Sequence, residues 1–146
     1  MKLPLPRWFA HRGGGSLAPE NTLAGIRLAA RLGFRAVEFD VMLSADGTPV
    51  LIHDETLERT TNGAGRVCGT PDAELFLLDA GNGERIPHFS DAAGLCREYG
   101  LLANVEIKPA TGFERQTAEV VARLTGALWE GAAVQPLISS FSLEAL

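Results

Sequence analysis

Two carboxylates, Glu38 and Asp40, stand two residues apart in the sequence AVEFDVML. Because successive side chains of a β-strand point to opposite faces, this spacing predicts that both carboxylates project from one face. Phe39 and its flanking valines, Val37 and Val41, then point to the other face, which must be apolar and covered. Two carboxylates on one face repel each other unless a positive charge lies between them, and a bound cation would supply that charge.

The same stretch continues through a turn into a second predicted strand at residues 49–52, which ends in His53. Asp46 and Gly47 form a strong turn signal, and only twelve residues separate Asp40 from His53, which leaves no room for a crossover helix. The sequence therefore predicts a strand, a tight turn and a second strand. A solvated acidic strand beside a surface histidine is the alternative interpretation of this stretch taken alone.

Two other segments also end in residues that can do chemistry. In the sequence LLANVEIK, Glu106 and Lys108 share one face of a predicted strand, while Val105 and Ile107 point to the other face. Near the N-terminus, a short predicted strand runs into His11 and Arg12, which three glycines follow. Glycine lets the backbone turn sharply and approach a ligand closely. We therefore count both segments as candidate parts of a site.

The elements that must position these residues alternate between strands and helices. We predict one strand from Ala36 through the acidic pair, further strands at 8–10, 49–52, 101–108 and 136–141, and helices at 19–32, 90–99 and 113–128. This order predicts a mostly parallel sheet, in which ligands bind at the carboxyl ends of the strands. The candidate residues all fall at those ends. Each alone has a structural explanation, but so many titratable groups at one rim cost desolvation unless they serve a ligand.

Local signals predict where the helices end. Pro19 suits a first helical turn, Ser90 is the predicted N-cap of the second helix, and Gly33 and Gly100 suit C-terminal caps. Residues 56–83 contain eight prolines, glycines and asparagines, which predicts an extended loop. A loop of that length is uncommon in a compact domain and is often functional.

Composition limits the classes of protein to consider. The chain has 146 residues, of which 46% are apolar and 21% charged, as expected for one globular domain. A net charge of −5 makes nucleic acid an unsuitable partner. Two cysteines form neither a disulfide framework nor a metal site. Prolines interrupt the N-terminus, and we expect no signal peptide, no membrane insertion and a cytoplasmic location.

Taken together, these residues resemble the glycerophosphodiester phosphodiesterase family over about residues 10–141. The resemblance rests on His11–Gly13, Pro19–Thr22, Glu38–Val41, Asp46–Gly47, His53–Glu55 with Leu57, Arg59–Thr61, Gly63 and Asn104–Pro109. It implies an enzyme with a TIM-barrel α/β fold, in which a divalent metal supports hydrolysis of glycerophosphodiesters to glycerol 3-phosphate and an alcohol. A small-molecule glycerophosphodiester would then be the substrate.

The resemblance also implies roles for particular residues. It makes Glu38, Asp40 and Glu106 the metal ligands, His11 and His53 the paired acid and base, and Arg12 and Lys108 the residues near the phosphate. Three carboxylates suit one hard cation, Mg²⁺ or Ca²⁺, better than zinc. Three alternatives stay open: either histidine could be the base, His53 could instead ligate the cation, and either water or the glycerol hydroxyl could attack phosphorus. His88 receives no role.

Length departs from the family. A complete (β/α)₈ barrel takes about 250 residues, whereas this chain reaches only the fifth strand and the start of the next helix. We therefore expect residues 1–146 to form a single partial domain, truncated after strand five. It would be either a fragment of a longer protein or a chain completed by a partner, and its open barrel edges would favour self-association.

Two other interpretations belong to different classes. A related-fold hydrolase, of the phospholipase C or sphingomyelinase D type, would also use paired histidines at a barrel mouth. A non-catalytic remnant that binds only phosphate or a partner is the second. The Asn104–Pro109 segment favours the glycerophosphodiesterase.

Overall fold

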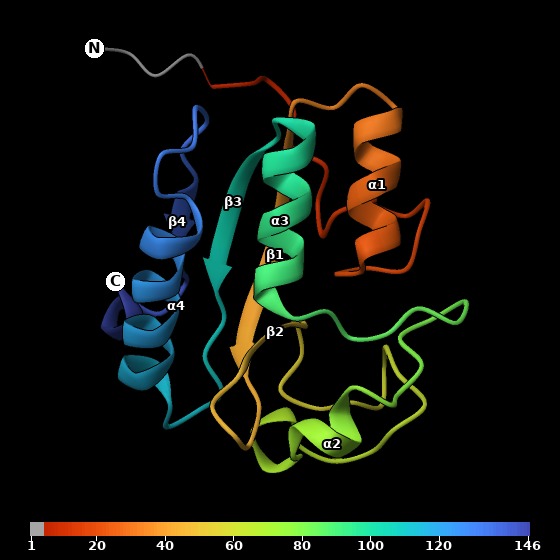
Figure 1. Ribbon diagram of the computed structural model, residues 1–146. Coiled ribbons are helices and arrows are strands. Elements are labelled where there is room, and N and C mark those ends of the chain that lie inside the picture. The colour runs from red at the N-terminus through yellow and green to blue at the C-terminus, as the bar shows by residue number, and fades with distance from the viewer. Residues whose placement is uncertain (1–4) are drawn as a thin grey trace.

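A computed structural model describes residues 5–146, which fold around a four-stranded sheet in the order β2-β1-β3-β4 (Figure 1). The strands are β1 (Ala36–Leu43), β2 (Pro49–Leu51), β3 (Leu102–Ile107) and β4 (Leu137–Ser139). β1, β3 and β4 run parallel, and β2 pairs antiparallel with β1. The predicted alternating order and mostly parallel sheet are therefore confirmed.

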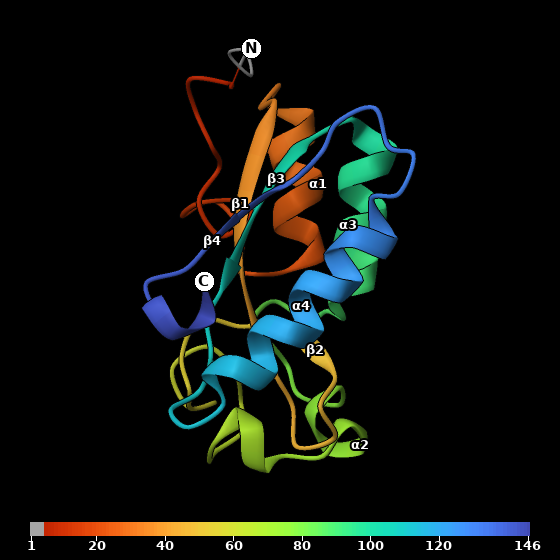
Figure 2. The same cartoon turned by 90° about the vertical axis from the view of Figure 1, so that its left-hand side faces the viewer.

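Three helices, α1 (Leu23–Arg31), α3 (Phe89–Tyr99) and α4 (Glu114–Leu128), cover one face of the sheet (Figure 2). Phe39 of β1 points to this face and packs against Phe89 of α3, which in turn contacts Trp129 at the end of α4. All three rings are buried, together with Ile26 and Val121. The alternation predicted for the acidic strand thus puts its apolar residues under the helices and its carboxylates on the opposite face.

The predicted turn joins β1 to β2. The backbone N–H of Ser44 donates to the carbonyl of Thr48, and Gly47, at a φ of +79°, donates to the carbonyl of Ser44. Val41 then lies opposite Leu51 in the antiparallel register. This hairpin brings the residues that follow β2 to the carboxyl end of β1.

Two predicted helix starts are wrong. α1 begins at Leu23 rather than Pro19, because Asn21 adopts a left-handed conformation (φ +55°) and Thr22 provides the N-cap, accepting from the N–H of Gly25. α3 begins at Phe89 with His88 as its N-cap, so Ser90 lies inside the first turn and its hydroxyl caps nothing. The predicted C-cap Gly100 is confirmed in the left-handed conformation.

The ends of the chain show shorter strands than predicted. The predicted strand at 8–10 reduces to a single bridge between Ala10 and Val37, because the chain turns immediately after Ala10. The predicted strand at 136–141 is confirmed as β4, although it is only three residues long. The helix expected from Ser142 is a 3₁₀ turn, η2 (Leu143–Ala145), in the described chain.

Residues 56–83 form the predicted loop, interrupted by a 3₁₀ turn, η1 (Val67–Gly69), and a short helix, α2 (Asp72–Leu75). This loop packs a second apolar cluster of its own against Met42 and Val50 of the hairpin. Leu57 is among its buried members. The loop is therefore held in a fixed position beside the carboxyl end of β1.

None of the helices formed by residues 5–146 is long and apolar enough to cross a membrane.

The glycine loop that follows Ala10 packs directly on α1. A Cβ atom added at Gly25 would lie 2.9 Å from the backbone nitrogen of Gly14, so no side chain fits between loop and helix. We expect Gly25→Ala to lower the free energy of unfolding by about 1–3 kcal/mol, because the loop must move. Gly94→Ala in α3 is the matched control: its methyl group meets no atom within 4 Å, so it should raise stability by roughly 0.5–1 kcal/mol. Chemical denaturation of both variants tests this, and equal effects at the two positions would contradict it.

Candidate functional site

Three carboxylates meet on the face of the sheet that the helices leave open. Glu38 and Asp40 lie on β1 and Glu106 on β3, where the parallel register places Asp40 opposite Glu106. One oxygen atom from each side chain lies within 4.8 Å of those of the other two. The structure therefore brings together the three residues that the sequence analysis proposed as metal ligands.

Glu38 shows why this cluster suits a cation. Burial raises its pKa to about 7, and the negative charges of Asp40 and Glu106 add to that effect, against a hydrogen bond from the backbone of Arg12. Its Oε1 atom is buried and has no hydrogen-bond partner among the described residues. At an effective dielectric constant of about 20, each pair of charges at this separation costs roughly 3–4 kcal/mol. A divalent cation would offset this repulsion and give the orphaned oxygen a partner, so the residues fit such an ion.

Asp40 is held by Asn21, which the sequence analysis quoted in a motif but gave no role. The Asn21 side-chain amide donates to Asp40 Oδ2 at 2.9 Å, and its oxygen accepts from the Asp40 backbone N–H at 3.1 Å. Asn21 is buried, and its left-handed conformation aims the amide at β1. Asn tolerates this conformation, but the helix predicted from Pro19 placed Asn21 inside the helix and hid that signal.

His11 and Arg12 lie beside Glu38. His11 Nε2 is 3.7 Å from Glu38 Oε2, and the histidine side chain is 70% exposed, so it is accessible to a ligand. The backbone N–H of Arg12 donates to the same Glu38 oxygen at 2.9 Å. The Arg12 guanidinium approaches Asp40, with 3.7 Å between Nε and Oδ2, and donates to Glu20 Oε1 at 2.9 Å.

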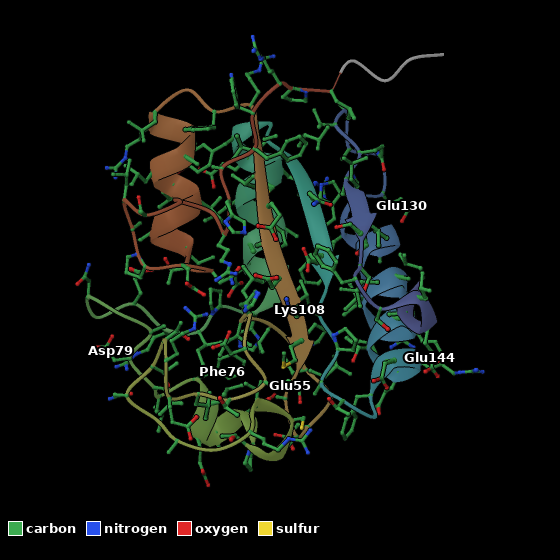
Figure 3. All side chains as sticks on the ribbon, turned by 180° about the vertical axis from the view of Figure 1, so that it is seen from behind. Glu55, Phe76, Asp79, Lys108, Glu130 and Glu144 are labelled. Atoms are coloured by element: carbon green, nitrogen blue, oxygen red, sulfur yellow. The ribbon has the colours of Figure 1, made fainter. Side chains whose placement is uncertain are left out.

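His53 reaches the cluster through Lys108. Lys108 Nζ lies 2.8 Å from His53 Nε2 and 3.8 Å from Glu106 Oε1. Since an ammonium group can only donate, His53 Nε2 accepts this hydrogen bond, and Nδ1 donates to Asp54 Oδ1 at 2.6 Å. Figure 3, which views the open face of the sheet, shows Lys108 beside the carboxyl-terminal half of β1.

Ionic contacts that hold His53 and Arg12 were not apparent from the sequence. Arg59, from the loop, donates to both Asp54 and Glu20. Hydrogen bonds from Arg59 are the largest cause lowering the pKa of Asp54 and of Glu20, so both stay ionised. The motifs included all three residues, but nothing local links positions 20 and 59.

A cavity of about 500 Å³ opens beside the carboxylates. Its lining combines the polar residues His11, Glu38 and Asn104 with apolar residues that include Leu5, Phe9 and Leu137. Such a space, with a few polar groups set in an apolar wall, is typical of a small-molecule site.

Known proteins resemble this chain in sequence and in fold. A solved phosphodiesterase from Oleispira antarctica, in complex with the product sn-glycerol-3-phosphate, matches 97% of this chain and 60% of its own, with 41% identity and a TM-score of 0.89. Mouse glycerophosphodiester phosphodiesterase 1 is 43% identical over 109 residues, which cover 68% of this chain and 33% of that protein. Glycerophosphodiester phosphodiesterase of Caldanaerobacter subterraneus is 44% identical over 107 residues, 68% of this chain and 44% of that protein.

The chain thus spans a third to less than half of these curated relatives and about 60% of the solved structure. The model of the glycerophosphoryl diester phosphodiesterase family matches residues 11–146, nearly the whole chain. The predicted fold class is confirmed, because the solved structures that match most of the chain are TIM-barrel enzymes. The chain belongs to the glycerophosphoryl diester phosphodiesterase family, and it forms part of the family's TIM barrel.

Proposed function

We propose that this chain provides the cation- and phosphate-binding part of an enzyme that hydrolyses glycerophosphodiesters to glycerol 3-phosphate and an alcohol. The observation that best supports this is the convergence of Glu38, Asp40 and Glu106 within 4.8 Å. His11 lies beside Glu38, and His53 is connected to Glu106 through Lys108. The product held by the Oleispira antarctica enzyme is consistent with the same substrate class.

Glu38, Asp40 and Glu106 would hold one divalent cation, Mg²⁺ or Ca²⁺, since all three offer hard oxygen ligands. When bound, the cation would act as a Lewis acid towards a phosphoryl oxygen. Asn21 keeps Asp40 in place by donating one hydrogen bond to its carboxylate and accepting one from its backbone N–H, so this ligand is already oriented.

Arg12 and Lys108 supply fixed positive charge for a substrate phosphate. Attack at phosphorus increases the negative charge on the phosphoryl oxygens, and cations already in position stabilise that charge without reorganisation. Arg12 Nε is buried 3.7 Å from Asp40 Oδ2 and has no hydrogen-bond partner among the described residues, so the guanidinium charge lies next to the carboxylates.

His11 and His53 would move the protons. One accepts the proton of the attacking hydroxyl and the other protonates the leaving alkoxide, tasks that suit an imidazole near neutral pH. In the present arrangement His53 Nε2 is an acceptor, and Asp54 holds the proton on Nδ1. Once the Lys108 ammonium directs its N–H to a substrate phosphate instead of to His53, Nε2 is free to take a proton.

A substrate panel tests the proposed reaction. A monodisperse preparation in which a partner chain or further residues complete the barrel should release glycerol 3-phosphate from glycerophosphocholine and should not act on intact lysolipid or sphingomyelin. Preference for the intact lipids would instead favour a phospholipase C or sphingomyelinase D type hydrolase. No turnover of any of them, in the presence of Mg²⁺ or Ca²⁺, would indicate a non-catalytic remnant.

The cation site predicts the effect of removing one charge. Glu106→Gln keeps the shape of the side chain, and we expect it to weaken Mg²⁺ or Ca²⁺ binding by at least about tenfold, the lower bound for altering a metal's surroundings. Glu98→Gln, an exposed position on α3, is the matched control and should bind as the parent does. Calorimetry with each ion decides this, and equal affinities in both variants would remove Glu106 from the site.

The proposed proton transfers predict large and interdependent effects. His11→Ala and His53→Ala should each lower the rate of hydrolysis by about 10²–10⁴. The double variant should lose less than the product of the two effects, because both histidines serve one reaction cycle. His88→Ala is the control, since His88 stacks on Phe76, and neither residue has a proposed role. A His53→Ala variant with the parent's rate would show that His53 takes no part.

The open edge of the sheet predicts self-association of the 146-residue polypeptide. Among the described residues, β4 pairs only with β3, and Ile138 and the nearby Phe141 are exposed. We expect a sedimentation mass above 15.6 kDa, because unpaired backbone groups on an edge strand favour association. Ile138→Lys should reduce that mass, whereas Leu77→Lys on the loop, also exposed, should not. A clean monomer would contradict this proposal.

A further inference from the structure

We propose that Arg59 is a positioning residue that joins His53 to Arg12, so that the proposed proton-transfer group and the proposed phosphate-binding group are held as one unit. This inference rests on the proposed function. Arg59 comes from the loop of residues 56–83. It is neither one of the proposed metal ligands nor one of the two histidines.

The Arg59 guanidinium binds two carboxylates at once. Its Nε and Nη2 atoms donate to the two oxygens of Asp54 at 2.6 and 2.9 Å. Its Nη1 and Nη2 atoms donate to the two oxygens of Glu20 at 3.0 and 2.8 Å. Lysine, a point charge on a flexible stem, lacks the planar set of donors that two bidentate contacts need. The geometry therefore selects arginine at this position.

Each of these carboxylates also holds a residue of the site. Asp54 Oδ1 accepts from His53 Nδ1 at 2.6 Å, and Glu20 Oε1 accepts from Arg12 Nη1 at 2.9 Å. The contacts thus run without a break from His53 through Asp54, Arg59 and Glu20 to Arg12. His53 and Arg12 belong to different loops, and this chain of ionic contacts connects them.

Repulsion between Asp54 and Glu20 explains why the link matters. The two carboxylates share Arg59 Nη2 as a donor, so they lie close together with a single cation between them. Without Arg59 they would repel each other and move apart, taking the His53 ring and the Arg12 guanidinium with them. A displacement of about 1 Å at reacting groups can cost about 10²-fold in rate.

The loop itself is built to hold Arg59. Leu57, two residues before it, is buried in the loop's own apolar cluster. Two residues after it, the Thr61 hydroxyl donates back to the Leu57 carbonyl at 2.7 Å. Arg59 itself is half exposed, so its ion pairs add little to overall stability. Positioning, rather than stability, is the contribution that this arrangement explains.

The matched comparison is Arg59→Ala against Arg66→Ala. Arg66 lies on the same loop and is exposed to a similar degree, 52% against 47%, but its ion pair goes to Glu55 and not to the contacts between His53 and Arg12. Arg59→Lys, which keeps the charge, is the conservative variant. Circular dichroism of all three should match the parent, because these are surface positions.

The first readout is the NMR signal of the His53 Nδ1 proton, measured on the protein without substrate and assigned by its absence in His53→Gln. The 2.6 Å hydrogen bond to Asp54 predicts a downfield signal that exchanges slowly with water. It should shift upfield or broaden in Arg59→Ala and stay unchanged in Arg66→Ala. An unchanged signal in Arg59→Ala would overturn the proposal, whether or not the protein turns over substrate.

The second readout is the hydrolysis of glycerophosphocholine. Arg59→Ala should lower kcat by about 10–100-fold, the usual cost of losing a residue that orients a ligand, and Arg59→Lys should lower it less. Arg66→Ala should stay within about twofold of the parent. Combining Arg59→Ala with Asp54→Asn should cost little more than either change alone, because both break the same link. Additive effects would overturn the proposal, whereas a parent without turnover would count against the proposed function and leave the NMR result to decide the role of Arg59.

Discussion

Repulsion among three partly buried carboxylates is the constraint on which the site depends. The parallel register of β1 and β3 sets Asp40 opposite Glu106, with Glu38 one pleat away on the same face. The repulsion between two of these carboxylates, roughly 3–4 kcal/mol, is several times the stabilisation that an exposed ion pair provides. The fold offsets this repulsion only in part, because Arg12 lies near Asp40 and Lys108 near Glu106. One oxygen of Glu38 has no hydrogen-bond partner among the described residues. That imbalance is the physical argument for a cation.

The backbone around the site is shaped to bring donors to these oxygens. The loop after Ala10 can place the Arg12 N–H on Glu38 only because Gly14 and Gly25 allow loop and helix to touch. Asn21, in a left-handed conformation just before α1, turns its amide towards Asp40. A left-handed Asn and a close approach that only glycine allows thus lie where the carboxylates need partners, as expected when a fold organises a site before any ligand arrives.

The sequence predicted those features that depend on neighbouring residues. Alternation along AVEFDVML placed Glu38 and Asp40 on one face, and Asp46-Gly47 located the hairpin turn, since both are local effects. Ser90 was a wrong choice of N-cap because the residue two positions earlier, His88, takes that place through its backbone alone. The contact of Arg59 with Glu20 spans 39 residues and involves loops, so no periodic pattern could have revealed it. Only the family resemblance had marked these positions, and without roles.

The long loop gains a physical explanation from the same contacts. A loop of this length is an entropic cost, and its second apolar cluster, with Leu57 and Val67 buried, offsets that cost without adding to the main core. A loop kept only for stability would have no need to present Arg59 at the rim of the sheet. Because Arg59 meets both Asp54 and Glu20 there, the packed cluster fixes the relative positions of two further loops. The buried apolar residues of this loop therefore hold the Arg59 guanidinium in place, and through Asp54 and Glu20 that guanidinium helps to position His53 and Arg12.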